Sequence, residues 1–361
     1  MKGERTMRRH IGRWVPVALG VVLVIAMLSA RAPAQKGGEV VIVTYGGSAA
    51  DALREAYWKP FTAETGIVVK EETPPTPAKV KAMVESGNVV WDIVEMDLNW
   101  IISLQKAGNY LEKIPPSQLP QKYVSALDKE AIHEYGIGAF YWAWVMAYRT
   151  DVFPAGNRPK NWVDFWDVKK FPGPRTLQDS PGSNMEFALL AAGKKPDALY
   201  PIDADLAFKK LDEIRPSIKK FWDTGALAPQ LLSDKEVFLG SVYSGRVKSL
   251  QEKGIPVEIE WNEGLLNLDY WTIVKGAKNS ANAIKLIGYM LDPARQAKFA
   301  KLIPYGPVNK EALPLIAPDV AKQLPSFAEN KKRMILYNSD WWGPHREELN
   351  ERWQQWKLKA K

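Results

Sequence analysis

The chain has 361 residues, with 49 Lys and Arg, 41 Asp and Glu, three His and no Cys. Without cysteine it forms no disulfide, carries no lipid-modified cysteine and has no thiolate for catalysis or zinc binding. Six basic residues and one acidic residue lie in the first 34, so the rest of the chain carries only about +3. A charge so small and dispersed argues against a nucleic-acid surface.

The first 34 residues have the order of a secretory signal peptide. Basic residues at positions 2–13 precede an uncharged apolar run at 15–30, and an Ala-x-Ala site follows at 32–34. The apolar run is shorter than the ~20 residues that a membrane-spanning helix needs. We therefore expect cleavage after Ala34, or after Ala32, and a mature protein in the periplasm.

The remaining residues are too many for one ordinary core and predict two lobes. Apolar runs alternate with helical patterns, many of them ended by glycine, and such alternation predicts βαβ units and a parallel sheet of buried strands. In chain order we expect strands at 39–45, 67–70, 91–96, 237–243, 257–261 and 269–276, and helices at 48–65, 80–86, 98–107, 184–192, 203–225 (interrupted at Pro216), 245–253, 280–291, 293–303 and 344–358.

The segment GIGAFYWAWVMAYRTD at 136–151 is a long aromatic run without helical spacing. It is too long for one ordinary strand, so it suits a strand that passes from one lobe into the other.

The mature chain has little that catalysis or a metal requires. His133 and His345 lie in polar stretches without a partner at metal-binding spacing, and no Gly-x-Ser-x-Gly elbow is present. Neighbouring acidic residues such as Glu71 and Glu72 point apart and do not form an acid–base pair. We therefore expect no enzyme activity, no metal and no cofactor.

The sequence TYGGS at 44–48 joins the first strand to the first helix. No nucleotide-binding glycine motif is present, but the turn stands at the carboxyl end of a strand, where open α/β sheets bind ligands. Tyr45, Gly46 and Gly47 either contact a ligand or form a plain connecting turn. Asp97 and Asn99, directly after the strand at 91–96, are further candidates.

Other candidates lie at the ends of later elements. SPGSN at 180–184 precedes a helix, so Ser183 and Asn184 would either receive a polar group or cap the helix. Arg246 begins a helix and Asp269 begins a strand, so they would bind a carboxylate and an ammonium, or pair with each other. Four aromatic residues offer faces to a cation: Tyr243, Trp271, Tyr305 and Trp342.

The chain resembles the extracytoplasmic solute-binding proteins of ABC importers, in the group that includes the spermidine/putrescine-binding proteins. The resemblance spans the mature chain and rests on FTAETGIVV (61–69), WDIV (91–94), AMVESG (82–87), NWVDFWDVKKFPGPRTL (161–177), YGPVN (305–309) and NSDWW (338–342).

The resemblance implies a periplasmic binding protein-like α/β fold, in which two α/β lobes are joined by crossover hinge strands (type II). It implies one lobe at 38–146 plus 269–310 and another at 149–265 plus 313–361. The ligand would lie in the cleft between them, and hinge closure would present a surface to the permease in the inner membrane.

The resemblance also implies that Asp269 holds an amine between the walls of Tyr243 and Tyr305. The family's acidic residues at 180 and 183 are serine here, and Asn267 replaces an expected aromatic residue. A polyamine would lose its second anchor and meet the charge of Arg246. We therefore expect a small amine-bearing solute, with a zwitterion such as an ω-amino acid favoured over a polyamine.

The sequence thus predicts a monomeric periplasmic binding component of an ABC importer, with the permease as partner. The alternatives are a periplasmic ligand sensor or an enzyme on the same fold.

Overall fold

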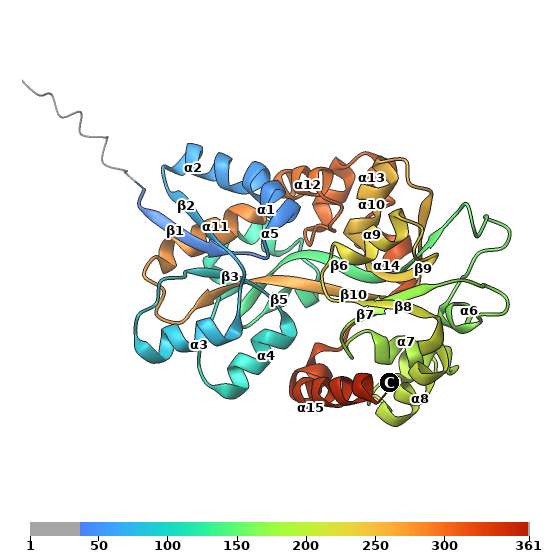
Figure 1. Cartoon of the computed structure of the whole chain (residues 1–361). Helices are drawn as coiled ribbons and strands as arrows, with labels where there is room; N and C mark the ends of the chain where they lie inside the picture. The colour runs from blue at the N-terminus through green and yellow to red at the C-terminus, as the bar shows by residue number, and fades with distance from the viewer. Residues whose placement is uncertain (1–36, 360–361) are drawn as a thin grey trace, which may run out of the picture. The chain divides into compact units, whose positions relative to one another are not determined.

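The computed structural model describes residues 37–359, in which helices surround a mixed sheet of 11 strands (Figure 1). The predicted signal peptide at 1–34 lies outside the described residues. No helix within 37–359 has both the length and the hydropathy of a membrane span.

The first part of the chain follows the predicted alternation closely. Leu53, Tyr57 and Phe61 are buried along one helical stretch, which contains a π-helical turn at 54–58 and ends at Gly66 with φ 71°. Only a residue that tolerates this left-handed conformation stops a helix in this way. The elements here are β1 (Glu39–Val43), α1 (Gly47–Leu53), α2 (Lys59–Thr65), β2 (Val68–Glu72), α3 (Pro77–Ser86), β3 (Ile93–Asp97), α4 (Leu98–Ala107), β4 (Leu111–Glu112), α5 (Gln121–Val124) and β5 (Ile132–His133).

The middle of the chain departs from the predicted pattern at one place. Residues 203–225 were expected to form a long helical segment interrupted at Pro216; the interruption is confirmed, but the residues after it, 218–222, form an edge strand and not a helix. Proline lacks the N–H that continues a helix, and the chain after it pairs with the sheet instead. The elements are β6 (Gly136–Arg149), α6 (Trp162–Trp166), β7 (Arg175–Gln178), α7 (Asn184–Ala191), α8 (Ala204–Ile214), β8 (Ile218–Trp222), α9 (Leu227–Ser233), β9 (Leu239–Tyr243) and α10 (Ser244–Glu252).

The last part contains a longer strand and a longer helix than expected. The strands predicted at 257–261 and 269–276 form a single strand, and the final helix begins before Pro344, where Asn338 accepts a hydrogen bond from the Trp341 N–H at 3.0 Å. The elements are β10 (Val257–Val274), α11 (Ser280–Met290), α12 (Pro293–Leu302), α13 (Pro318–Ala321), α14 (Ala328–Arg333), β11 (Ile335–Leu336) and α15 (Ser339–Leu358).

The sheet is parallel at its two ends and antiparallel in the middle, so the expectation of a parallel sheet holds only in part. The main order is β2-β1-β3-β10-β6-β9-β7-β8. β1 runs parallel to β2 and β3, and β7 runs parallel to β8 and β9. β10 runs antiparallel to β3 and β6, and β6 runs antiparallel to β9. The long strands β6 and β10 therefore connect two parallel α/β units.

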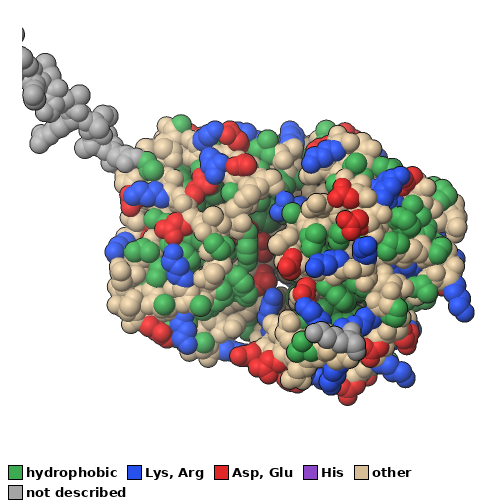
Figure 2. Space-filling model, in the orientation of Figure 1, with side chains coloured by type: hydrophobic (Ala, Val, Ile, Leu, Met, Phe, Trp, Pro, Cys, Tyr) green, Lys and Arg blue, Asp and Glu red, His purple; other side chains and the backbone are tan. Residues whose placement is uncertain are grey.

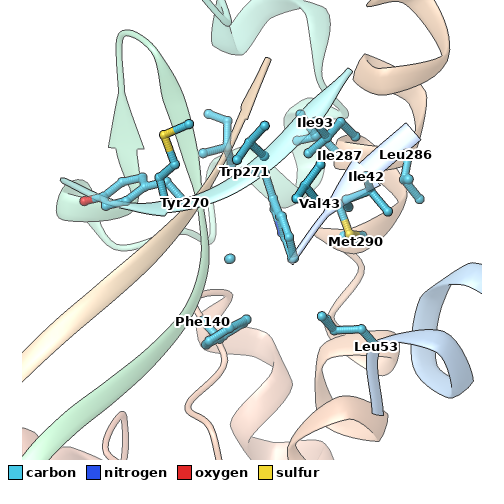
Figure 3. Close-up of a cluster of buried hydrophobic side chains, with 14 of the residues drawn as sticks. Ile42, Val43, Leu53, Ile93, Phe140, Tyr270, Trp271, Leu286, Ile287 and Met290 are labelled. Carbon is cyan, nitrogen blue, oxygen red and sulfur yellow. The ribbon is translucent and has the colours of Figure 1, made fainter. Parts of the chain in front are cut away.

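Two large hydrophobic cores lie along this sheet. The first core gathers side chains from β1, β3, α4 and α11, and Figure 3 shows part of it, with Trp271 and Phe140 near Ile42 and Leu53. The second core gathers side chains from β7, β9, α7, α8, α10 and α15. β6 contributes Tyr141 to the first core and Met146 to the second. This confirms that β6 is one strand, and it extends from one core into the other.

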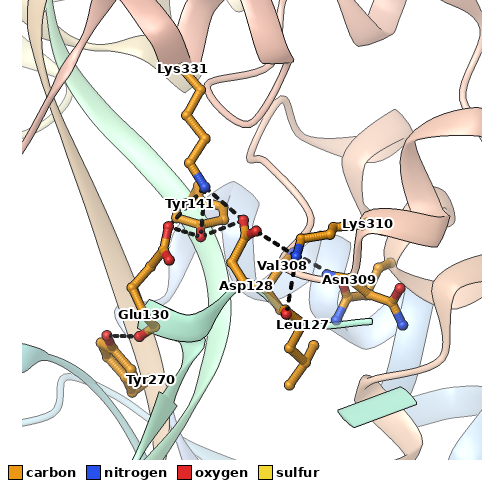
Figure 4. Close-up of polar contacts among 10 residues, drawn as sticks. Leu127, Asp128, Glu130, Tyr141, Tyr270, Val308, Asn309, Lys310 and Lys331 are labelled. Atoms are coloured by element: carbon orange, nitrogen blue, oxygen red, sulfur yellow. Dashed lines mark hydrogen bonds and ion pairs between the residues drawn. The ribbon is translucent and has the colours of Figure 1, made fainter. Parts of the chain in front are cut away.

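An ion-pair network holds the segment that precedes β11 against β6. Lys331 on α14 contacts Asp128 at 2.6 Å and Glu130 at 2.8 Å, and the Tyr141 hydroxyl bonds to both carboxylates (Figure 4). These groups are part-buried, so solvent screens them less than exposed pairs. The network fixes where the chain returns to the sheet before α15.

Candidate ligand-binding site

A cavity of about 420 Å³ lies between side chains of the two cores. Figure 2 shows a hollow in the middle of the drawn face, where acidic and basic side chains meet. The cavity is lined by three acidic residues (Glu95, Asp97, Asp269), two arginines (Arg246, Arg346), eight aromatic residues (Tyr45, Trp100, Phe140, Trp142, Trp144, Tyr243, Tyr305, Tyr337) and six small or amide residues (Gly46, Ala49, Gln178, Ser180, Gly182, Gly225).

The acidic wall is built by the pairing of β3 with β10. In this antiparallel register Asp97 lies opposite Asp269, and Glu95 lies opposite Trp271. Side chains two residues apart on a strand share a face, so Glu95 and Asp97 point to the same side as Asp269. Asp97 also accepts a hydrogen bond from the Trp100 N–H at 3.0 Å and so caps α4.

Asp269 is a buried acid with one hydrogen-bond donor already in place. The Trp142 indole donates to it at 3.0 Å, and its residue is 7 % exposed. Burial, followed by the charge of Asp97, raises the pKa of Asp269 to about 7, while hydrogen bonds from Trp142 and Glu95 act in the opposite direction. An ammonium group placed here would favour the ionised form.

Arg246 supplies positive charge from the second core. It stands in the first turn of α10, and its Nη1 lies 3.3 Å from the Ser48 hydroxyl on α1. Its buried Nε has no hydrogen-bond partner, and within residues 37–359 no carboxylate lies within ion-pair distance of its guanidinium. A guanidinium in this state suits a carboxylate ligand, which accepts two parallel N–H bonds.

Aromatic rings form the walls between the charged groups. Phe140 stacks on Tyr305 with centroids 4.8 Å apart, and Trp142 meets Trp144 and Tyr243 edge-on at 4.4 and 5.3 Å. Phe140, Trp142 and Trp144 alternate along β6, so they share one face of that strand. This alternation was visible in the aromatic run of the sequence and was the signal that could have identified them.

The turn after β1 contributes backbone to the cavity. Gly46 lines it with φ 75°, and a Cβ at this position would lie 3.0 Å from Thr73 Oγ1. Only glycine adopts this conformation without strain and also leaves that space open. Tyr45 is 46 % exposed and lines the cavity, so its ring belongs to the cavity wall.

The buried acid Glu186 contacts a side chain that packs against the lining of the cavity. Glu186 on α7 is fully buried and accepts hydrogen bonds from the Tyr200 hydroxyl and the Trp342 indole. Trp342 stacks on Tyr337, which lines the cavity. Burial raises the pKa of Glu186 to about 7.

Replacing Glu186 by Gln is expected to stabilise the protein at pH 8 but not at pH 4. The folded pKa lies above the unfolded value, so the folded state loses stability as the pH rises from about 4.5 to 7 and regains none above that. Gln carries no charge at either pH, and the gain at pH 8 should be about 1–3 kcal/mol. Urea unfolding at both pH values measures it, with the exposed Glu236→Gln as control. An equal gain at both pH values would contradict the assignment.

A second hollow, of about 320 Å³, lies between the start of α8 and α15. Several of its polar groups already have partners: Arg352 pairs with Asp205 at 2.6 Å, Asp203 caps α8, and His345 stacks on Trp341. The cavity between the cores is larger and is lined by both acidic residues and arginines, so it is the candidate site. Within residues 37–359 no group of three or more His, Cys, Asp or Glu is placed to hold a metal.

Comparison with known proteins assigns this fold and cavity to a family. A family described as bacterial extracellular solute-binding protein matches residues 56–329, which is most of the chain. The chain belongs to the bacterial extracellular solute-binding proteins. The resemblance read from the sequence is thereby confirmed.

Individual members of the family are similar over almost the whole chain. The gamma-aminobutyric acid-binding protein of Pseudomonas aeruginosa is 35 % identical over 335 residues, 91 % of this chain and 93 % of that protein. The spermidine/putrescine-binding periplasmic protein of Escherichia coli K12 is 26 % identical and covers 78 % of this chain and 81 % of its own length. An ABC transporter substrate-binding protein from Bradyrhizobium japonicum USDA 110 superimposes with a TM-score of 0.83 at 35 % identity, over 88 % of this chain and 99 % of that one. The predicted α/β periplasmic binding protein fold is confirmed.

Seven of the 12 residues predicted for the site of this solute-binding protein line the cavity: Tyr45, Gly46, Asp97, Tyr243, Arg246, Asp269 and Tyr305. The structure does not bring the other five, Gly47, Asn99, Ser183, Asn184 and Trp342, to its lining. Gly47 begins α1 beside open space, whereas the other four side chains are buried.

Two of these five side chains make structural contacts within the protein. Asn184 donates to the carbonyl oxygens of Gln178 and Ser180, and Trp342 donates to Glu186. Ser183 has φ 66° and does not cap α7 with its side chain. The sequence missed Glu95, whose signal was an acidic residue inside an otherwise apolar strand, and also Tyr337 and Arg346, for which the sequence offers no local signal.

Proposed function

We propose that this protein is the periplasmic substrate-binding component of an ABC importer and that it captures a small solute with one ammonium and one carboxylate group, such as an ω-amino acid. The observation that carries the proposal is the placement of Asp269 and Arg246 on opposite cores around one cavity. Asp269 receives the ammonium, and Arg246 receives the carboxylate. The volume, about 420 Å³, is in the usual range for small-molecule sites.

A zwitterion fits the charges of the cavity better than a polyamine does. Two guanidinium groups, Arg246 and Arg346, face the same space. A second ammonium group would approach one of them, and like charges brought together away from water repel strongly. The similarity to a gamma-aminobutyric acid-binding protein over 91 % of the chain supports the same choice. The more distant relatives are named for binding polyamines, which carry amine groups as the proposed ligand does.

The two cores correspond to two lobes in this proposal. One lobe comprises 38–146 plus 269–310, and the other comprises 149–265 plus 313–361. Most buried side chains divide between the two cores along these limits, and the exceptions lie near the crossovers, with Trp144 and Met146 in the second core and Trp261 in the first. The lobes close over the ligand by bending at the crossover strands, as hinge proteins do.

Contacts across the cavity are consistent with a closed arrangement. Arg246 bonds to Ser48, and α15 approaches α4 so closely that a Cβ on Gly343 would lie 2.8 Å from Ile102 Cγ2. These contacts join elements of different cores. They would break on opening and re-form around the ligand.

The same proposal covers the partner and the compartment. A chain with a cleavable signal peptide would act in the periplasm as a monomer and deliver its ligand to a membrane permease, without catalysis. Names of relatives that refer to periplasmic binding and to an ABC transporter support this. A ligand sensor and an enzyme on the same fold are the alternatives, and the absence of a catalytic constellation within residues 37–359 favours transport over the enzyme.

Thermal unfolding with added ligands tests the ligand class. We expect 4-aminobutyrate at 100 times its Kd to stabilise the folded protein by about 2.7 kcal/mol, because it binds only that state. Putrescine and spermidine should raise the Tm far less at the same concentration. Stabilisation by spermidine alone would overturn the zwitterion assignment.

A further inference from the structure

Two acidic groups, Glu95 and Asp269, touch in the wall of the cavity. Glu95 is 3 % exposed and Asp269 is 7 % exposed, and their carboxyl groups lie in hydrogen-bonding contact. The Glu95 carboxyl also accepts a hydrogen bond from the backbone N–H of Tyr45. Within residues 37–359 no Lys or Arg forms an ion pair with Glu95 or Asp269.

Two adjacent buried carboxyl groups cannot both be ionised, because their mutual repulsion and the loss of hydration would cost too much. A shared proton removes the repulsion and turns one carboxyl into a hydrogen-bond donor to the other. Burial, followed by the charge of Asp269, raises the pKa of Glu95 well above its usual range. Glu95 lies deeper and lacks the indole donor of Asp269, so Glu95 keeps the proton.

Of the remaining charges around the pair, that of Asp97 raises the pKa of Asp269, whereas burial acts on both acids and Glu95 lies deeper. One carboxylate oxygen of Asp97 accepts a hydrogen bond at the N-terminus of α4, where the helix dipole stabilises the negative charge. Arg246 and Arg346 line the cavity and stay charged, and the hydroxyls of Tyr45, Tyr243 and Tyr305 stay neutral near pH 7. Burial raises the pKa of Tyr243 to about 12.

We propose that Glu95 is a neutral positioning residue, which donates a hydrogen bond to Asp269 and so holds that carboxylate ready for a single ammonium group. This inference rests on the proposed function, since Asp269 is the ammonium acceptor there. With Glu95 neutral, two anions remain in the wall, Asp97 and Asp269. Asp97 caps the N-terminus of α4, so Asp269 is the anion that has no helix N-terminus beside it. The site therefore favours a ligand with one ammonium group, because Asp97, the second anion of the wall, already bonds to that helix.

The test compares Glu95→Ala with Glu95→Gln over pH 5.5 to 9, by calorimetric titration with 4-aminobutyrate. In the wild type the affinity should fall as the pH drops through about 7, because Asp269 becomes protonated. Glu95→Ala removes the donor, so binding at pH 7 should weaken about tenfold and the midpoint should move to higher pH. Glu95→Gln keeps a donor, and it should restore most of the affinity and the wild-type midpoint. Exposed Glu236→Gln is the matched control.

Two outcomes would overturn the inference. If Glu95→Gln weakens binding as much as Asp269→Asn does, Glu95 acts as an anion. If Glu95→Ala changes neither the affinity nor the midpoint, Glu95 does not position Asp269.

An infrared measurement without ligand separates this inference from the proposed function. At pH 9 the wild-type spectrum minus that of Glu95→Gln should contain the C=O stretch of a protonated carboxyl group. If 4-aminobutyrate does not bind at any pH, the proposed function fails, but this band still decides the protonation of Glu95. Absence of the band overturns the inference even if 4-aminobutyrate binds.

Discussion

Replacing Asp269 by Asn is expected to weaken the binding of 4-aminobutyrate at least about hundredfold. The ammonium group would lose its charged acceptor in the buried wall, and truncating one partner of such a charge pair costs about 2–5 kcal/mol. The amide keeps the shape of the side chain and can still accept from the Trp142 indole, so the fold should survive. Calorimetric titration at pH 8, where wild-type Asp269 is ionised, measures the loss.

The matched control is Asp319→Asn, which removes the same charge from an exposed position on α13. It should leave the affinity within about twofold of the wild type, because an exposed charge far from the cavity is screened by solvent. Thermal unfolding of both variants without ligand confirms that each is folded. A loss of less than about tenfold in Asp269→Asn would remove Asp269 from its assigned role.

Replacing Arg246 by Gln is expected to invert the selectivity of the site. Binding of 4-aminobutyrate should weaken about hundredfold, because the ligand carboxylate loses a bidentate, charge-assisted partner. Binding of butylamine, which lacks the carboxylate, should not weaken, and binding of putrescine should strengthen as the repulsive charge disappears. Titration of one variant with all three ligands measures the change.

Arg352→Gln serves as the control for the loss of a guanidinium. Arg352 lies on α15, and its partly exposed pair with Asp205 contributes about 0–1 kcal/mol to stability and should contribute nothing to affinity. A parallel Arg346→Gln variant identifies which guanidinium receives the carboxylate. If Arg346→Gln abolishes binding of 4-aminobutyrate and Arg246→Gln does not, the carboxylate anchor is Arg346.

The order of elements could be predicted from the sequence because their signals are local. Gly66 and Gly108 end helices where the periodicity stops, and the aromatic run of β6 forms one continuous strand. Two errors had equally local causes. The residues after the predicted interruption at Pro216 form β8 and not the predicted helix. The break between 261 and 269 was predicted to be a loop, although β10 continues through it with a shifted register against β6.

The candidate site could be predicted only where its residues follow the end of a strand or begin a helix. Tyr45, Asp97, Arg246 and Asp269 have such positions, and the structure brings all four to one cavity. Asn184 and Trp342 have similar positions, but their side chains turn into structural hydrogen bonds. Whether a polar side chain faces a ligand or its own neighbours depends on packing that the local sequence does not contain.

The sequence by itself determined the family, the α/β pattern and the two charges that suit a zwitterion. Only the tertiary structure decided that Glu95 touches Asp269, and that Tyr337 and Arg346 reach the cavity from the C-terminal segment. The reason is that these contacts depend on pairing between β3 and β10 and on the packing of α15, across more than 150 residues of chain. Local patterns fix which elements form, whereas the register between distant strands fixes which side chains meet.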